Sequence, residues 1–288
     1  MQFNNKAVII TNLVRRRRSL GEYSRLFVKF RKVLNIVLDV LKDKKLQSYG
    51  IEKQLSIQIK SLNKICEFIP QRVPTLSVEE FLKDSHLSTY FETSRNVRLG
   101  ALFESYGSDK NALGYSVVYQ LILDSLPKIP INIVEIGIGS NYLDTKSNMG
   151  VMGSPGASLR AFRDYQVNAN IIGLDIDTRI LISEERISTF YCDQNIPQTI
   201  NHALKDIQNI SLMIDDGLHN LDSNMNTFKE FYAIQKVGCW IVIEDILDEP
   251  SVISAWQILA ELISPKNVSY FIKCRKSILF CSVRTVDA

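Results

Sequence analysis

The sequence has few of the residues that define several specialised classes of protein. Its five cysteines form no CxxC pair, which argues against a disulfide framework and a structural zinc site and favours a reducing cytoplasm. Only 13 glycines and 8 prolines occur among 288 residues, so collagen-like and disordered compositions are excluded. No apolar run approaches the roughly 20 residues that span a bilayer. The apolar stretch 7–14 precedes the basic run 15–18, the reverse of a signal peptide.

Charge and glycine are unevenly distributed along the chain. Residues 1–66 contain 15 Lys and Arg but only 4 Asp and Glu, although the formal net charge of the whole sequence is just +3. Three glycines precede position 105 and ten follow it. These shifts predict a basic helical N-terminal region over residues 1–95 and a larger domain over residues 96–288.

Apolar residues recur at three- and four-residue spacing in the N-terminal region. The pattern predicts helices over 22–46 and 52–68, and Ser77 with Glu80 forms a capping box that begins a third helix. The wide apolar stripe favours a packing or homo-oligomer contact. The basic face also leaves open a weak contact with an anionic membrane surface. No nucleic-acid partner is expected, because the basic residues lack interleaved aromatic side chains.

From residue 131 the pattern alternates between buried strands and helices. Five β-rich runs are expected as strands: 131–138, 170–176, 187–192, 210–215 and 237–243. Helical patterns over 158–165, 197–204 and 220–232 separate them, which predicts a doubly wound α/β sheet. Runs 268–274 and 277–283 are joined by two residues only, so they must pair antiparallel. This layout resembles class I S-adenosylmethionine-dependent methyltransferases, whose Rossmann-like sheet binds ligand beyond the carboxyl ends of its strands.

Polar residues occur where the first three strands of the expected sheet end. Glu135 is followed by Gly137 and Gly139, which allow a tight turn and a close approach to a ligand. Asp175 ends the second strand, where an acidic side chain can bind ribose hydroxyls. Asp193 follows the third strand, where it can accept from an adenine amino group. Together these residues predict a nucleotide-type cofactor site.

Acidic residues also follow the fourth and fifth strands. Asp215 and Asp216 leave one strand and Glu244 and Asp245 leave the other. Converging carboxylates repel unless a cation binds them, and an all-oxygen set suits Mg²⁺ or Mn²⁺. Because neighbouring strand residues point opposite ways, one of Asp215 and Asp216 is expected at the metal. His219, three residues past Asp216, is the candidate general base. The alternative for the carboxylates is helix capping and solvated loops.

Other polar residues are expected to have structural roles. Asp177 precedes 178–181 as a helix N-cap, while His86 and His202 are ordinary surface or core histidines.

Seven short motifs in order carry a family resemblance. They are 106–110 with Gly114 and Tyr115, then 134–139, 156–160, 173–176, 193–194, 214–219 and 243–245. Over about residues 100–250 the chain resembles the metal-dependent sugar O-methyltransferases of macrolide biosynthesis. The resemblance implies S-adenosylmethionine, Mg²⁺ and a glycoside or saccharide that carries two neighbouring hydroxyls.

The resemblance also implies roles for individual residues. Asp216, Glu244 and Asp245 become metal ligands, and His219 becomes the base. The cofactor side comprises Tyr106, Ser108, Tyr115, Glu135, Gly137, Gly139, Asp175, Asp193, Gln194 and Asp215, of which Tyr106, Ser108 and Tyr115 belong to a segment that closes over the cofactor. The chain departs from the family pattern at Cys192, Leu218 and 238–239, which bears on the choice of acceptor.

Two other functions remain open from the sequence. A nucleic-acid methyltransferase would use the basic N-terminus, although an acidic site disfavours phosphate-rich substrates. A non-catalytic scaffold of the same fold would bind cofactor without turnover. An oxidative role on non-haem iron is disfavoured, because no set of two histidines and one carboxylate is found.

Overall fold

The computed structural model describes residues 60, 64, 73–83 and 98–286. The chain divides into two compact units, Met1–Ile69 and Pro70–Ala288. The helices expected over 22–46 and 52–68 lie outside the described residues, apart from Lys60 and Lys64, which are helical. The fold that follows is therefore that of the second unit.

Nine strands form one sheet in the order β1-β8-β9-β7-β6-β2-β3-β5-β4. The strands are β1 (Thr75–Ser77), β2 (Ile131–Ile136), β3 (Ala169–Asp175), β4 (Ser183–Glu184), β5 (Ile187–Tyr191), β6 (Ile210–Asp215), β7 (Trp240–Ile246), β8 (Asn267–Lys273) and β9 (Ile278–Arg284). In the centre, β2 pairs parallel with both β3 and β6. β9 runs antiparallel to both β7 and β8. The expected parallel sheet with an antiparallel C-terminal hairpin is confirmed.

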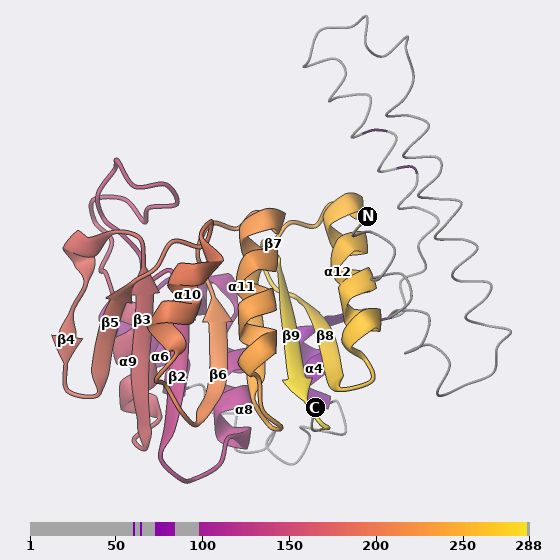
Figure 1. Ribbon diagram of the computed structural model, residues 1–288, viewed down its shortest axis with the longest axis horizontal. Helices are drawn as coiled ribbons and strands as arrows, with labels where there is room; N and C mark the ends of the chain where they lie inside the picture. The colour runs from indigo at the N-terminus through magenta and orange to yellow at the C-terminus, as the bar shows by residue number, and fades with distance from the viewer. Residues whose placement is uncertain (1–59, 61–63, 65–72, 84–97, 287–288) are drawn as a thin grey trace, which may run out of the picture. The chain divides into compact units, whose positions relative to one another are not determined.

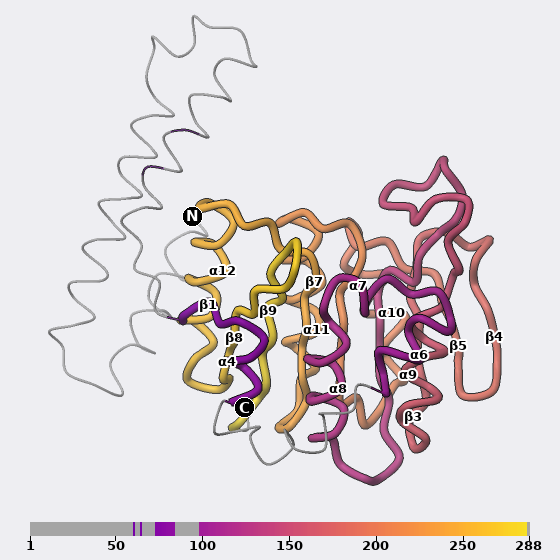
Figure 2. Tube along the Cα trace, turned by 180° about the vertical axis from the view of Figure 1, so that it is seen from behind, coloured from indigo at the N-terminus to yellow at the C-terminus, as the bar shows by residue number. Residues whose placement is uncertain are grey.

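Helices cover both faces of this sheet (Figures 1 and 2). One buried apolar cluster joins the sheet to α4 (Val78–Lys83), α6 (Arg98–Tyr106), α8 (Ser116–Ser125) and α9 (Ala157–Tyr165). A second cluster on the opposite face joins it to α10 (Pro197–Leu204), α11 (Leu221–Ile234) and α12 (Pro250–Ile263). The short α7 (Lys110–Leu113) connects α6 to α8. The interior strands are therefore buried on both faces, which explains their continuous apolar runs.

Two expected capping interactions are confirmed. Ser77 N donates to Glu80 Oε2 at 2.7 Å, and Glu80 N donates to Ser77 Oγ at 3.2 Å, which is the reciprocal pair of a capping box. Asp177 caps η3 (Thr178–Ile180), a 3₁₀ turn where a helix over 178–181 was expected. Both caps occupy backbone N–H groups that the first turn leaves free.

The strand expected over 237–243 begins and ends three residues later, as β7. Gly238 has φ +80°, and Cys239 N donates to Lys236 O, which closes a turn where the strand was expected to begin. As a result, Glu244 and Asp245 lie within β7 and not beyond it.

Strands β1 and β4 and helices α6, α7, α8 and α12 go beyond the expected pattern. β1 precedes residue 96 yet belongs to the second unit, where it pairs parallel with β8. Within the part of the chain that the structure describes, no helix combines the length and apolarity needed to cross a membrane.

Candidate functional site

A cavity of about 670 Å³ opens at the carboxyl ends of the central strands. This volume lies in the range of small-molecule and cofactor sites. Nine of the residues expected at the site line the cavity: Ser108, Gly137, Gly139, Asp175, Asp193, Gln194, Asp216, His219 and Asp245. The other five, Tyr106, Tyr115, Glu135, Asp215 and Glu244, lie outside the cavity lining.

The turn after β2 has a steric requirement for glycine. Gly137 has φ +83°, and a Cβ there would lie 2.1 Å from the backbone oxygen of Asp216. A Cβ at Gly139, which has φ +81°, would instead meet the flexible end of the Met149 side chain, at 2.6 Å. The first glycine is therefore needed so that the β2 turn can approach the end of β6, a reason that spacing alone does not reveal.

Asp175 and Asp193 lie at the cavity, where the ends of β3 and β5 meet. Asp175 is only 8% exposed, and it accepts hydrogen bonds from Ile138 N and Asp177 N, both at 2.9 Å. Burial raises the pKa of Asp175 above its ordinary value, and these bonds partly oppose the rise. Asp193 accepts from Asn195 N at 2.9 Å. Both carboxylates are thus held in place by backbone donors at the edge of the cavity.

Asp215, which ends β6, and Asp216, which follows it, point in opposite directions, as expected for neighbouring residues. Asp215 is fully buried and accepts from Gln194 Nε2 at 2.6 Å and from Asn224 Nδ2 at 3.0 Å. Gly217 N donates to it as well, at 3.2 Å. Asp216 is 25% exposed and faces the cavity. Asp215 is thus a buried, hydrogen-bonded residue outside the cavity lining, whereas Asp216 lines the cavity.

An irregularity in β7 positions the second acidic pair. The pairing of β7 with β9 shifts register between Ile243 and Ile246, and Asp245 has φ +52°. Bulges of this kind redirect side chains next to active sites. Here Glu244 is directed into the interior, 1% exposed, whereas Asp245 faces the cavity.

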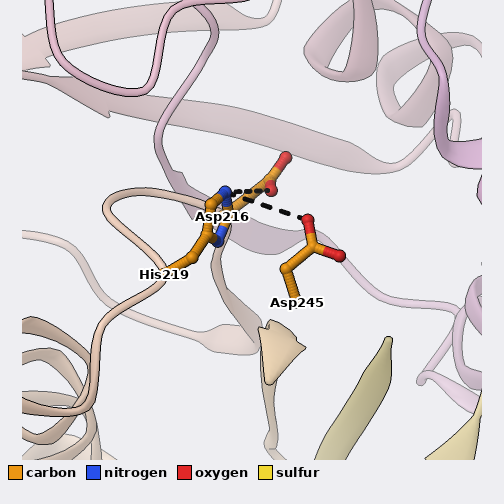
Figure 3. Close-up of side chains that lie close together, drawn as sticks. All are labelled: Asp216, His219 and Asp245. Atoms are coloured by element: carbon orange, nitrogen blue, oxygen red, sulfur yellow. Dashed lines mark ion pairs between the residues drawn. The ribbon is translucent and has the colours of Figure 1, made fainter. Parts of the chain in front are cut away.

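Asp216, His219 and Asp245 converge at the cavity and form an outer group (Figure 3). His219 Nε2 lies 3.8 Å from Asp216 Oδ1 and 3.8 Å from Asp245 Oδ2. One ligand atom from each residue lies within 4.8 Å of the others, a spacing that could hold a metal ion. The side chains are partly exposed, and two of the three are hard oxygen donors, so the group fits a divalent cation that keeps positions open for substrate.

Lys110 forms an inner group with three carboxylates. Its Nζ lies 2.6 Å from Asp216 Oδ2, 2.6 Å from Glu244 Oε1 and 3.2 Å from Glu135 Oε1, and the side chain is 2% exposed. Burial alone would lower the pKa of Lys110, but the three negative charges outweigh it and raise the pKa well above its ordinary value. The ammonium therefore stays charged and pairs with one oxygen of each of the three carboxylates. The only sequence signal for Lys110 was its position in the 106–110 motif.

Two buried tyrosines complete the inner side of the site. Tyr119 donates to Glu244 Oε1. Tyr115 donates to Asp245 Oδ1 and shares a hydrogen bond with Ser277. Burial and the charge of Glu244 raise the pKa of both phenols, so they remain protonated donors.

The structure places the three residues of the segment around Tyr106 and Tyr115 in different surroundings. Tyr115 is fully buried. Tyr106 donates to Asp164 Oδ2 of α9, and it lies outside the cavity lining. Of the three residues expected to close over the cofactor, only Ser108 reaches the cavity.

The sequence is similar to sugar O-methyltransferases of known function. It is 25% identical over 170 residues to 8-demethyl-8-(2-methoxy-alpha-L-rhamnosyl)-tetracenomycin-C 3'-O-methyltransferase of Streptomyces olivaceus, which covers 58% of this chain and 42% of that protein. It is 29% identical over 116 residues to demethylmacrocin O-methyltransferase of Streptomyces fradiae, which covers 40% of this chain and 27% of that protein. The chain thus spans less than half the length of these relatives. No family model matches it.

The fold is also found in solved structures. The MycE methyltransferase from the mycinamycin biosynthetic pathway, in complex with Mg and SAH, aligns with a TM-score of 0.54 at 19% identity, covering 71% of this chain and 62% of that one. Its complex with Mg, SAH and mycinamycin VI aligns with a TM-score of 0.53 at 19% identity, covering 72% and 61%. The chain therefore has the class I methyltransferase fold, and its sequence resembles the sugar O-methyltransferases.

Proposed function

We propose that the protein transfers a methyl group from S-adenosylmethionine to a sugar hydroxyl with the help of Mg²⁺ or Mn²⁺. The observation that carries this proposal is the outer group, in which two carboxylates and a histidine meet at the edge of a cofactor-sized cavity. The relatives named for rhamnosyl and macrocin substrates support a glycoside or saccharide as the acceptor.

Two sets of residues hold the cation and the cofactor. Asp216, Glu244 and Asp245 hold the cation. The cavity residues at the ends of β2, β3 and β5 hold the cofactor, with Asp175 on the ribose and Asp193 on the adenine. The cofactor supplies an electrophilic methyl group, and the cation supplies a Lewis acid and a template for two neighbouring hydroxyls.

His219 takes the proton from the reacting hydroxyl. Its Nε2 faces the open side of the site, between Asp216 and Asp245, so it can reach a hydroxyl held there. Its φ of +49° is unusual for a non-glycine residue, and strain of this kind is concentrated at functional sites.

Methyl transfer to a panel of glycosides with vicinal hydroxyls tests this function by mass spectrometry. Product of +14 Da, lost with EDTA and restored with Mg²⁺, is expected because a methyl replaces a proton in a metal-dependent step. Activity that survives EDTA would refute the metal dependence.

Calorimetry with S-adenosylhomocysteine tests the cofactor site separately. Saturable binding is expected, weakened in Asp175→Ala. A chain that fails to bind at millimolar ligand would not be a methyltransferase.

Replacement of His219 tests the base. His219→Ala is expected to retain Mn²⁺ and S-adenosylhomocysteine binding while turnover falls by roughly 10²–10⁴-fold, the usual loss for a general base. Near-native turnover would exclude the role, and loss of Mn²⁺ binding would make His219 a metal ligand instead.

A further inference from the structure

The three carboxylates proposed to hold the cation are each bound from behind through one oxygen. Asp216 presents Oδ2 to Lys110 Nζ, while its Oδ1 is the atom that lies 3.8 Å from His219. Asp245 presents Oδ1 to Tyr115, while its Oδ2 lies 3.8 Å from His219. In both aspartates one oxygen is held in the interior and the other is directed to the open side.

Glu244 is bound from the same direction. Its Oε1 accepts from both Lys110 Nζ and the Tyr119 hydroxyl. Lys110 also lies 5.9 Å from the centre of the Tyr119 ring, so the two donors are packed together. All three donors come from one short segment, residues 110–119, which includes α7 and the first turn of α8.

We propose that Lys110, Tyr115 and Tyr119 are positioning residues for the metal ligands, an inference that rests on the proposed function. Partners of this kind fix the orientation of ligating carboxylates, so that their free oxygens converge before the ion arrives. The segment 110–119 thus forms the rear wall of the site, and Asp216 and Asp245 line the cavity in front of it.

The three donors are buried, so they do not serve as solvent-exposed polar groups. Lys110 is 2% exposed, and Tyr115 and Tyr119 are fully buried, so all three donor groups lie away from solvent. A purely structural role would require only that the fold be stable. A positioning role requires, in addition, that metal affinity depend on each of the three donors.

Tyr119→Phe and Tyr115→Phe test the proposal, because each removes one hydroxyl without changing charge or ring packing. The probe is Mn²⁺ alone, titrated into the full chain and followed by the electron paramagnetic resonance signal of the free ion. Each variant is expected to bind Mn²⁺ about 10–100-fold more weakly, the usual cost of losing such a partner. S-adenosylhomocysteine affinity, measured by calorimetry, is expected to stay at the wild-type value.

Tyr165→Phe is the matched control. Tyr165 donates to Asp124 Oδ1 at 2.7 Å, the same kind of bond outside the cavity lining, so its loss should leave Mn²⁺ affinity unchanged. Thermal unfolding of all three variants shows whether each remains folded.

Three outcomes distinguish the positioning role from the proposed function. Folded Tyr119→Phe and Tyr115→Phe chains that bind Mn²⁺ as the wild type does would overturn the positioning role alone. Wild type that binds Mn²⁺ but methylates no sugar would overturn the proposed function alone. Wild type that fails to bind Mn²⁺ would overturn both.

Discussion

Lys110 is the one residue in the described interior whose charge meets three carboxylates at once. Its partners come from three places: Glu135 on β2, Asp216 after β6 and Glu244 on β7. A buried ion pair contributes little net stability relative to apolar packing, but removing one partner leaves the other charges unpaired. The loss of Lys110 should therefore destabilise the fold by more than the loss of its hydrogen bonds alone.

Lys110→Met is expected to destabilise the fold by about 3–5 kcal/mol, the usual cost of breaking a buried ion pair from one side. The cause is the repulsion left among Glu135, Asp216 and Glu244. Urea unfolding followed by circular dichroism measures the change. Adding Glu135→Gln removes one of the unpaired charges and should recover part of the loss. A Lys110→Met chain as stable as the wild type would show that the carboxylates do not depend on this charge.

At the scale of residues, the sequence predicted the acidic side of the site better than its partners. Asp216 and Asp245 could be expected at the cavity because both lie at the carboxyl ends of recognisable strands, and these ends meet at one edge of a parallel sheet. Lys110 and Tyr119 could not, since they lie 134 and 125 residues before Glu244. Their contacts depend on how the segment before β2 packs, which no local pattern encodes.

The turn after β2 illustrates what one element requires. Gly137 and Gly238 both have φ near +80°, but a Cβ at Gly137 would meet backbone, whereas a Cβ at Gly238 would meet nothing within 4 Å. Substitution at Gly238 therefore measures the free-energy cost of a positive φ alone. Substitution at Gly137 measures that cost together with the cost of a steric clash.

Gly238→Ala is expected to cost about 1–2 kcal/mol, the strain of a left-handed conformation. Gly137→Ala should cost more, because the Asp216 backbone must also move, and it should disturb cofactor binding. Urea unfolding and calorimetry with S-adenosylhomocysteine measure the two effects. Equal stability losses in the two variants would contradict the steric requirement.

The loop that follows Gly139 is held to the sheet by Asp177. This carboxylate accepts from Ser140 Oγ at 2.6 Å, from Thr145 Oγ1 at 2.9 Å and from Arg179 Nε at 2.7 Å. Arg179 is the main cause of a pKa for Asp177 far below its ordinary value of 3.8. A lowered folded pKa means that the stabilisation is complete above the ordinary value and is lost as the pH falls toward the lowered one.

The backbone amides of residues 140–149 should therefore exchange slowly at neutral pH in the wild type. They should be better protected there than in the Asp177→Asn variant. The variant removes the charge, so its loop should exchange faster at neutral pH and show less loss of protection when the medium is acidified. Comparison of mass-spectrometric exchange at matched intrinsic rates measures this. Identical protection in both chains at neutral pH would show that the loop is held by other contacts.

For the whole molecule, the long apolar runs predicted the strands of the sheet, whereas the short elements were not predicted. The strands expected over 187–192 and 210–215 match β5 and β6 within one residue. β1 has only three residues, too few for a periodic pattern, and it is recognised only through its pairing with β8. The homo-oligomer contact expected for residues 1–95 stays a prediction.

Burial of the cysteines gives a prediction for the whole chain. It raises the pKa of Cys192, Cys239 and Cys274 to about 12 and that of Cys281 well above its ordinary value. Since the thiolate is the reactive form, these four thiols should resist Ellman's reagent at pH 8 in the native state. Cys66 lies outside the described residues, so at most one of five thiols should react quickly, and all five after denaturation. Rapid reaction of a second native thiol would contradict this burial.

The separation of Lys110 from its last partner has a consequence for biosynthesis. Glu244 emerges from the ribosome 134 residues after Lys110. At a translation rate of roughly 5–20 residues per second, Glu244 is synthesised on the order of 10 s after Lys110. Until then residues 110–119 cannot be buried with all three ion pairs of Lys110 formed, so we expect the segment to stay exposed on the nascent chain and to be a target for chaperones. The rear wall of the site is therefore translated early, but it packs into the domain among its last parts.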